Sequence, residues 1–316
     1  MKKLSLLFIS MMILSLFGCV KILNEDLKSK SPKLVLNAVI SPDSLFTVNV
    51  SHTLNIFDDE SEQNLPFIDS ADVKLYENGD FLTRLTNIGY GYYVNPGYYP
   101  SEGNNYRIEV SYGDYHPVET ETAIPPVVTI LEFDTVLLRS TDEYSGTTVK
   151  YIGLLKYKDP GEKENQYQLS ATCTDYGPDG KIYTYKSSLW PVEGDKKFFD
   201  SWYNGRLVWD DGYTNGNEVT VRFVFFDNYD YEKSKSRESG LLRFTFQFQS
   251  ITREYLTYLK SYGVYVETGG SADPFSEPVV IYSNVENGYG IFGSYTQDTA
   301  SVDVITNYKA GKGAAK

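Results

Sequence analysis

LLRFTFQFQS, residues 241–250, is the stretch that decides the fold class of this chain. Every second side chain is apolar, from Leu242 through Phe244 and Phe246 to Phe248, and the side chains between them are polar. Successive residues of a strand point to opposite faces of a sheet, so this period of two predicts a strand with one buried face. The polar side chains would then lie on a second face that is solvated, as is common in antiparallel sheets.

The same alternation recurs along most of the chain and predicts an all-β protein. The clearest further stripes are Phe46/Val48/Val50, Val73/Leu75, Tyr106/Ile108/Val110/Tyr112, Tyr167/Leu169/Ala171/Cys173 and Val219/Val221/Phe223/Phe225. Between two stripes stands Glu77-Asn78-Gly79-Asp80. An Asn-Gly pair in this position predicts a β-hairpin, because both central residues of the tightest turn need a positive φ.

One segment, residues 252–262, has a helical period instead. Tyr255, Leu259 and Tyr262 fall on one face of a helix of about three turns, which we expect to pack on the second sheet. The residues expected at its ends are Thr252 as the cap and Gly263 as the stop.

The strand spacing predicts two domains. Six or seven short strands over residues 32–125 fit an immunoglobulin-like β-sandwich, which ends near Ile124-Pro125-Pro126 because prolines cannot continue a ladder. Residues 126–308 are predicted to form a larger antiparallel β domain that carries the helix. Residues 309–316 are expected to be a flexible tail.

The N-terminus has the pattern of a bacterial lipoprotein signal. A basic start and an apolar run too short to span a membrane precede Leu16-Phe17-Gly18-Cys19. We expect residues 1–18 to be removed, and Cys19 to carry the acyl chains, palmitate among them, at the start of a tether over residues 19–31. Position 20 is valine and not aspartate, so nothing there argues for retention at the inner membrane.

The composition excludes several chemistries. The 42 acidic and 29 basic residues give a formal net charge of −13, which disfavours nucleic acid as a partner. The two histidines, His52 and His116, show no metal-ligand spacing and no neighbouring nucleophile motif, so we expect no metal, no cofactor and no catalytic residues. Cys173 continues a strand stripe and is interpreted as a buried apolar residue.

Two acidic runs have open interpretations. Asp58-Asp59-Glu60 and Asp210-Asp211 could bind calcium or act as an acid/base pair, the second pair being the best candidate for a hydrolase. Neither has the oxygen-ligand period of a calcium loop, so we favour solvated acidic loops.

Tyrosines are concentrated in residues 89–100. Tyr92 starts a predicted strand over residues 92–94, whereas Tyr98 and Tyr99 are predicted loop residues. They could form an aromatic contact surface or pack over the edge of the sandwich, and packing is the favoured reading.

Ordered motifs through nearly the whole mature chain resemble a known family. The residues that carry the resemblance are Pro32 to Asn37, Ser41-Pro42-Asp43-Ser44, Ala71-Asp72-Val73 to Gly79, Gly91-Tyr92-Tyr93, Tyr106-Arg107, Asp273-Pro274-Phe275-Ser276-Glu277-Pro278, Tyr282-Ser283-Asn284-Val285-Glu286-Asn287-Gly288 and Gly290-Ile291-Phe292-Gly293. They are similar to the Bacteroidota outer-membrane lipoproteins known as domain of unknown function 4249. The last three motifs suggest an ordered loop system pinned against the second domain.

The resemblance implies a role, because members of that family are often encoded beside TonB-dependent receptors. It implies a non-enzymatic accessory at the outer membrane that captures an unknown ligand for such a receptor or docks on it, on a membrane face left open. A surface adhesin or structural envelope protein is the alternative, and a hydrolase using acidic residues is less favoured. The candidate contact residues are Tyr98, Tyr99, Pro274, Phe275, Asn284, Asn287 and Phe292.

Overall fold

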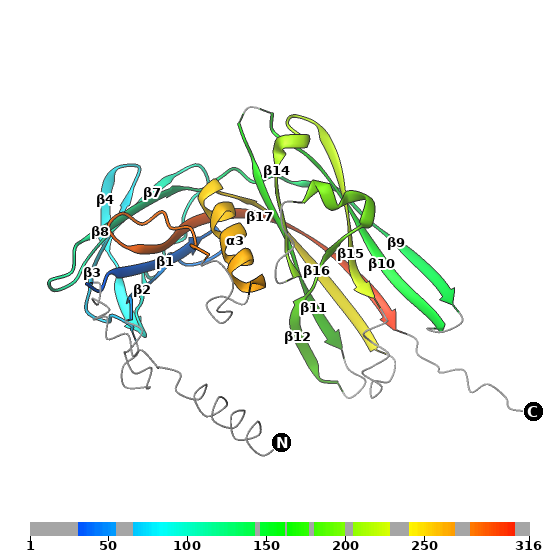
Figure 1. Ribbon diagram of the computed structural model, residues 1–316, viewed down its shortest axis with the longest axis horizontal. Coiled ribbons are helices and arrows are strands. Elements are labelled where there is room, and N and C mark those ends of the chain that lie inside the picture. Colours follow the sequence, from blue (N-terminus) through cyan, green and yellow to red (C-terminus); the bar gives the residue numbers. More distant parts are fainter. Residues whose placement is uncertain are drawn as a thin grey trace, which may run out of the picture. The chain divides into compact units, whose positions relative to one another are not determined.

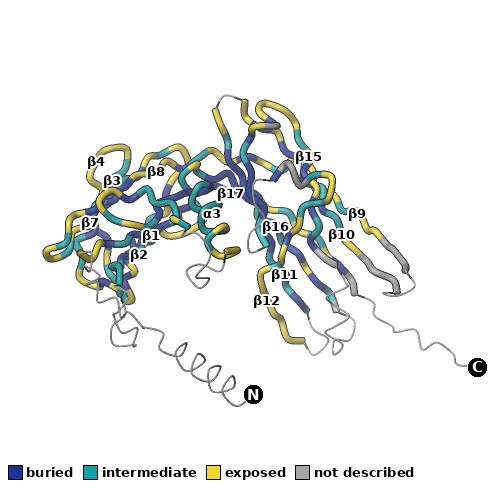
Figure 2. Tube along the Cα trace, in the orientation of Figure 1, coloured by how far each residue is buried: buried dark blue, intermediate teal, exposed yellow. Residues whose placement is uncertain are grey.

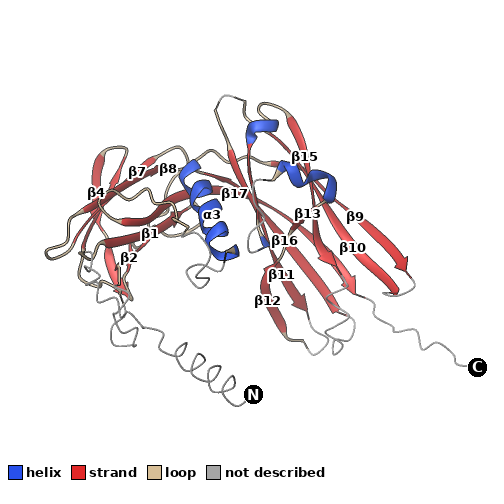
Figure 3. Ribbon diagram, viewed as in Figure 1, coloured by secondary structure: helices blue, strands red, loops and turns tan. Residues whose placement is uncertain are grey.

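The chain is built almost wholly from β-strands. The computed structural model describes residues 31–54, 66–142, 146–161, 163–176, 180–199, 205–227, 240–268 and 279–306, and those from Pro32 onward belong to one compact unit. Within these residues there is one α-helix, beside two short 3-10 helices (Figure 3), so the all-β class with one helix is confirmed. Cys19, its signal peptide, most of the tether and the C-terminal tail lie outside the described residues.

The elements are labelled in Figure 1. The strands of the first half are β1 (Leu34–Ile40), β2 (Thr47–His52), β3 (Asp72–Glu77), β4 (Asp80–Arg84), β5 (Thr86–Gly89), β6 (Tyr92–Val94), β7 (Asn105–Ser111) and β8 (Val118–Ala123). Those of the second half are β9 (Ile130–Asp142), β10 (Gly146–Lys158), β11 (Gln166–Tyr176), β12 (Ile182–Ser187), β13 (Trp190–Pro191), β14 (Leu207–Asp210), β15 (Glu218–Asp227), β16 (Gly240–Ile251) and β17 (Tyr289–Thr306). The helices are η2 (Glu193–Phe198), η4 (Asp211–Tyr213) and α3 (Arg253–Glu267).

Three sheets make up the fold. The largest has the order β12-β11-β16-β17-β1-β2-β6-β5, with β14 also paired to β11. Two four-stranded sheets have the orders β13-β15-β10-β9 and β4-β3-β7-β8. Buried residues alternate with more exposed ones along strands such as β1, β7 and β8 (Figure 2), as the period of two in the sequence predicts.

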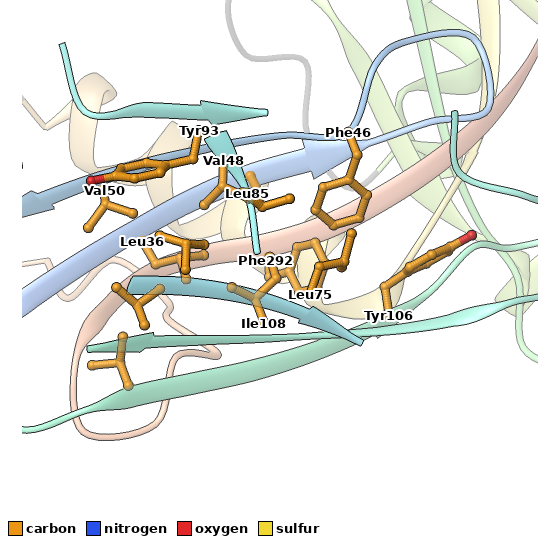
Figure 4. Close-up of a cluster of buried hydrophobic side chains, with 14 of the residues drawn as sticks. Leu36, Phe46, Val48, Val50, Leu75, Leu85, Tyr93, Tyr106, Ile108 and Phe292 are labelled. Carbon is orange, nitrogen blue, oxygen red and sulfur yellow. The ribbon is translucent and has the colours of Figure 1, made fainter. Parts of the chain in front are cut away.

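The first core lies between β17-β1-β2-β6 and β4-β3-β7-β8. Its side chains are mostly aliphatic, with Leu36 and Val48 from one sheet facing Leu75 and Ile108 from the other (Figure 4). Phe292 of β17 lies in the same cluster and is fully buried. We call this the first sandwich.

The second core lies between β11, β14 and β16 on one side and β10 and β15 on the other. It is rich in aromatic rings: Trp209 stacks on Phe248 at 6.1 Å, and Phe248 stacks on Tyr167 at 5.5 Å. The Trp209 indole donates a hydrogen bond to the hydroxyl of Tyr157 at 3.0 Å. Cys173 is fully buried in this core, as the sequence predicts. We call this the second sandwich.

Strand β17 belongs to both sandwiches. Its first residues, from Tyr289 to Ser294, pair in parallel with β1, and its remaining residues pair antiparallel with β16. Gly290 permits the parallel pairing, because its φ is +115° and a Cβ there would come within 1.9 Å of the carbonyl oxygen of Leu36. The boundary predicted between residues 125 and 126 and the immunoglobulin-like topology stay predictions, and β17 adds a strand from the chain's far end to the first sandwich.

The predicted hairpin is confirmed and the predicted helix end is wrong. Asn78 and Gly79 both have positive φ between β3 and β4. Helix α3 continues through Gly263, a buried residue, to Glu267, because tertiary packing outweighs the weak helical propensity of glycine. Thr252 stands at the N-cap position but its side chain makes no capping hydrogen bond.

Candidate functional site: a groove beside helix α3

A groove of about 540 Å³ lies beside α3 on the face of the large sheet that is turned away from both cores. We call it the groove throughout. The described residues that line it are Asn37, Ala38, Val39, Asn49, Tyr92, Gln168, Arg206, Val208, Tyr255, Tyr258, Leu259, Tyr262 and Ile291. They come from β1, β2, β6, β17, β11 and β14 as well as the helix, so the groove joins parts of both sandwiches.

The floor of the groove is a row of paired residues across the sheet. Asn37 of β1 is in register with Ile291 of β17 and with Asn49 of β2, and Asn49 is in register with Tyr92 of β6. These side chains alternate with core residues such as Leu36 and Val48, so the pleat turns them away from the first core. The floor thus presents two amides, an isoleucine and a tyrosine that is 45% exposed.

Helix α3 supplies the aromatic wall. Ile251 precedes the cap residue Thr252, and Leu256 is the fourth residue of the helix. Both are buried in one cluster, and their contact fixes the start of the helix. Gly293 of β17 then allows close approach, since a Cβ there would lie 2.8 Å from the Cβ of Tyr255. Farther along, the rings of Tyr258 and Tyr262 are stacked, with centroids 5.8 Å apart and planes 5° apart.

Tyr255 and Tyr258 of the wall are neutral hydrogen-bonding groups. Burial raises the pKa of Tyr255, an effect that the neighbouring Arg206 guanidinium opposes. Burial also raises the pKa of Tyr258, and the nearby Tyr262 and Tyr255 add to that rise. Both hydroxyls therefore keep their protons at neutral pH and can donate or accept hydrogen bonds.

The rest of the wall is formed by an amide side chain, that of Gln168, and a cationic one, that of Arg206. Gln168 of β11 donates to Gln249, which in turn donates to Gln297 at 3.1 Å, so an amide ladder leads away from the groove across three strands. Arg206, just before β14, is the one charged residue among the described residues of the lining. Three other surface grooves on the described part of the chain each include several carboxylates.

This set of side chains suits binding better than catalysis. It holds no histidine, thiol or carboxylate among the described residues, and its tyrosines have no neighbouring carboxylate or histidine in the described lining to activate them. His52 and the exposed His116 both lie outside the groove lining that the structure describes. Over the described residues there is also no cluster of three His, Cys, Asp or Glu side chains able to hold a metal ion.

The acidic pair Asp210-Asp211 has structural contacts. Asp210 caps η4 by accepting a hydrogen bond from the backbone of Gly212 at 3.0 Å. Asp211 is 4% exposed and accepts from the backbone N–H of Asn165 at 2.9 Å. These bonds account for both carboxylates locally, and Asp58-Asp59-Glu60 lies outside the described residues.

Tyr98 and Tyr99 are loop residues, as predicted, with different surroundings. Tyr98 packs against the first core, and its hydroxyl donates to the Glu77 carboxylate at 2.7 Å. Tyr106 and Asn104 donate to the same oxygen of Glu77. Tyr99 is 55% exposed. The binding role of both residues stays a prediction.

The loop before β17 is pinned, but to a different partner from the one expected. The hydroxyl of Thr120 in β8 donates to the Asn284 carbonyl at 2.9 Å, so the loop lies against the first sandwich and not only against the second. The Asn284 side chain bonds both the N–H and the carbonyl of Phe292, at 2.9 and 2.8 Å. The sequence could not show this, because it depends on β17 entering the first sandwich.

Of the predicted binding residues that the structure describes, none lines the groove. Phe292 is a core residue, Asn284 holds its backbone, and Asn287 is exposed at a turn with φ +60°. Pro274 and Phe275 lie outside the described residues. The helical spacing of the α3 tyrosines is one signal for the groove, and Asn37 and Tyr92 stand in motifs that carry the family resemblance, whereas Arg206 stands in none of them.

A further aromatic feature borders the floor. Tyr90 has φ +53° between two glycines, Gly89 and Gly91, and its ring is 70% exposed. Asn49, a floor residue, donates to the Tyr90 carbonyl at 3.1 Å and holds this turn in place. The Gly-Tyr-Gly sequence is the local signal for such a turn.

The described residues include no helix with the length and apolarity needed to cross a bilayer.

The comparisons with known proteins identify the family. No curated protein matches the chain. One solved structure that is similar over 70% of the chain, a protein of Corynebacterium diphtheriae described as membrane anchored, has 11% identity and a TM-score of 0.19. The match spans 55% of that protein's length. A family model described as domain of unknown function (DUF4249) matches residues 20–301, and the chain therefore belongs to the DUF4249 family.

Proposed function

We propose that this protein is a lipid-anchored accessory of the outer membrane that captures a ligand in the groove and passes it to, or docks on, a TonB-dependent receptor. The groove carries the proposal: it is concave, aromatic on one wall, and lined by a few polar side chains, as is typical of small-molecule sites. The lipoprotein signal that ends at Cys19 supports the anchor. The receptor is implied by the family resemblance.

The role is non-enzymatic in this proposal. Tyrosine, asparagine and arginine side chains supply stacking surface, hydrogen bonds and one positive charge, which together hold a ligand without activating it. A tether of about twelve residues, at most roughly 40 Å when extended, would keep the groove close to a receptor in the same membrane. Capture near the receptor raises the local ligand concentration there.

Co-purification tests the docking part. The full-length lipoprotein, extracted with mild detergent, is expected to bring down a TonB-dependent receptor. A preparation that preserves known receptor complexes but yields no receptor with this chain would contradict the proposal. Protease treatment of whole cells separates the adhesin alternative, because a chain protected from protease cannot act at the cell surface.

A paired variant tests the capture part. Tyr258→Ala removes an aromatic ring from the wall of the groove, and Tyr183→Ala removes one from β12, where Tyr183 is 49% exposed. We expect growth on the receptor's substrate to fall only in the Tyr258→Ala strain, with equal amounts of both proteins in the membrane. Equal growth of the two strains would show that the groove is not the site of ligand capture.

A further inference from the structure

We infer that the ligand of the groove is an acidic saccharide, a chain of sugar rings bearing carboxylate or sulfate groups, whose anionic group is bound by Arg206. The inference rests on the proposed capture function and names the class of ligand that this site would take. It is carried by the charge of the lining, by the pairing of the floor strands and by the chemistry of the aromatic wall.

The charge of the groove is opposite to that of the protein. The chain has a formal net charge of −13, yet the described lining contains one cation and no anion. No carboxylate lies within 4 Å of the Arg206 guanidinium among the described residues, whereas Arg84, Arg222 and Arg243 each have one. An arginine without an acidic partner, in a partly enclosed site, is suited to a carboxylate or sulfate of a ligand.

The floor strands disfavour an extended peptide. β1, β2 and β6 are each paired on both sides, so their main-chain groups are already bonded within the sheet. At the open edge of β17, the Asn284 side chain occupies the N–H and carbonyl of Phe292. Binding by strand addition is therefore blocked along the floor, and recognition must come from side chains.

The side chains of the floor and wall match sugar hydroxyls. Asn37 and Asn49 each offer amide donors and an acceptor, and neutral tyrosine hydroxyls stand opposite them on α3. Aromatic rings such as the exposed Tyr92 give an apolar face on which the C–H side of a sugar ring can rest. A lipid tail would leave these polar groups without partners, which is costly once water is excluded.

Arg206 is held in place for this task. Tyr255, which is 9% exposed, lies beside the guanidinium and is itself fixed against β17 by the close approach at Gly293. A guanidinium that is already oriented loses less side-chain freedom on binding an anion. The sugar rings would extend from Arg206 along the amide floor toward Tyr92.

Isothermal titration calorimetry on the full chain in detergent tests the assignment. The probes are hexagalacturonate, which bears only carboxylates, a sulfated chondroitin hexasaccharide, which bears carboxylates and sulfates, and neutral maltohexaose, so that the probes separate acidic from uncharged rings and show whether added sulfates strengthen binding. We expect at least one acidic probe to bind at least about tenfold more tightly than maltohexaose, with affinity falling as salt is raised. Arg206→Gln is expected to weaken that binding by at least about tenfold.

Arg84→Gln is the matched control, because Arg84 lies on β4 outside the groove lining and loses the same charge. It should leave the acidic probe's affinity unchanged. If Arg206→Gln does not fold, Tyr92→Ala is the second variant, because it removes an exposed ring from the groove floor. It should weaken binding of the acidic probe by about tenfold.

Two outcomes would overturn the inference. Maltohexaose binding as tightly as the acidic probes, with Arg206→Gln unchanged, would remove the anionic requirement but leave ligand capture standing. No binding of any probe at about 1 mM would remove the saccharide class. Receptor co-purification is measured separately, so failure of this inference is distinguishable from failure of the proposed function.

Discussion

The two sandwiches reach their cores by different routes. The first core is mostly aliphatic and is completed by Val285 and Phe292, which come from the far end of the chain. The second is rich in aromatic rings and combines the hairpins β9–β10 and β11–β12 with the longer-range pairs β10–β15 and β11–β16, and Val304 of β17 lies in it as well. The first sandwich therefore depends on a strand that the second sandwich also needs.

This dependence explains where the groove lies. Its floor uses β17 where that strand pairs with β1, and its wall rests on the same strand through Tyr255. Contacts this distant in sequence form late and carry a large entropy cost of chain closure. The groove should then be present only when both sandwiches are folded.

The largest expected effect comes from the aromatic core. Trp209→Ala removes a fully buried ring and leaves the Tyr157 hydroxyl without its donor. We expect a loss of about 5 kcal/mol in the free energy of unfolding. Urea denaturation followed by far-UV circular dichroism measures it, and a loss below about 1 kcal/mol would show that the core tolerates the cavity.

A smaller effect is expected where β17 enters the first sandwich. Gly290→Ala places a Cβ against the Leu36 carbonyl and requires a φ that alanine rarely adopts. We expect a loss of about 3 kcal/mol. Gly79→Ala is the matched control, since Gly79 also has a positive φ but no atom lies within 4 Å of its Cβ position. Equal losses for the two variants would mean that the close approach to β1 is unimportant.

The smallest effect is the pH dependence that Glu77 of the first sandwich contributes. Hydrogen bonds, first from the hydroxyl of Tyr98 and then from Tyr106 and Asn104, lower the pKa of Glu77 below its ordinary value of 4.5. A lowered pKa in the folded state gives stability that is fully present above pH 4.5 and is lost as the pH falls through the lower folded value. Acidification from about pH 6 to about pH 4 should therefore lower the melting temperature.

Glu77→Gln tests that assignment. The variant should lose less melting temperature over the same acid range than the wild type, because its side chain no longer takes up a proton. Glu102→Gln, at an exposed position in the neighbouring loop, should keep the acid sensitivity of the wild type. If Glu77→Gln and the wild type respond alike, the network around Glu77 does not contribute to the pH dependence.

Local pattern was enough to predict the strands and the turn, because those depend on neighbouring residues. The stripe from Leu242 to Phe248 is buried as predicted, and Asn78-Gly79 forms the predicted turn. The tyrosine spacing predicts helix α3, but the predicted end at Gly263 is wrong, since the packing that extends the helix to Glu267 comes from distant strands.

The groove could be predicted only in part for the same reason. The sequence places Tyr255 and Tyr262 on one helical face. Nothing in the sequence around Asn37 or Arg206 indicates that these two residues lie beside the tyrosines. Their meeting depends on the parallel pairing of β1 with β17, which joins residues more than two hundred and fifty positions apart. Single-sequence periodicity identifies strands but not their partners.

Unfolding of Phe292→Ala, followed by tryptophan fluorescence, tests the shared role of β17 most directly. The three tryptophans, Trp190, Trp202 and Trp209, all lie in the second half of the sequence, whereas Phe292 is buried in the first core. If β17 couples the two sandwiches, the fluorescence transition should move to a lower denaturant concentration, in step with the transition seen by circular dichroism. The free energy of unfolding obtained from both should fall by about 3–5 kcal/mol. A fluorescence transition that stays at the wild-type midpoint while a separate circular dichroism transition moves would contradict the account.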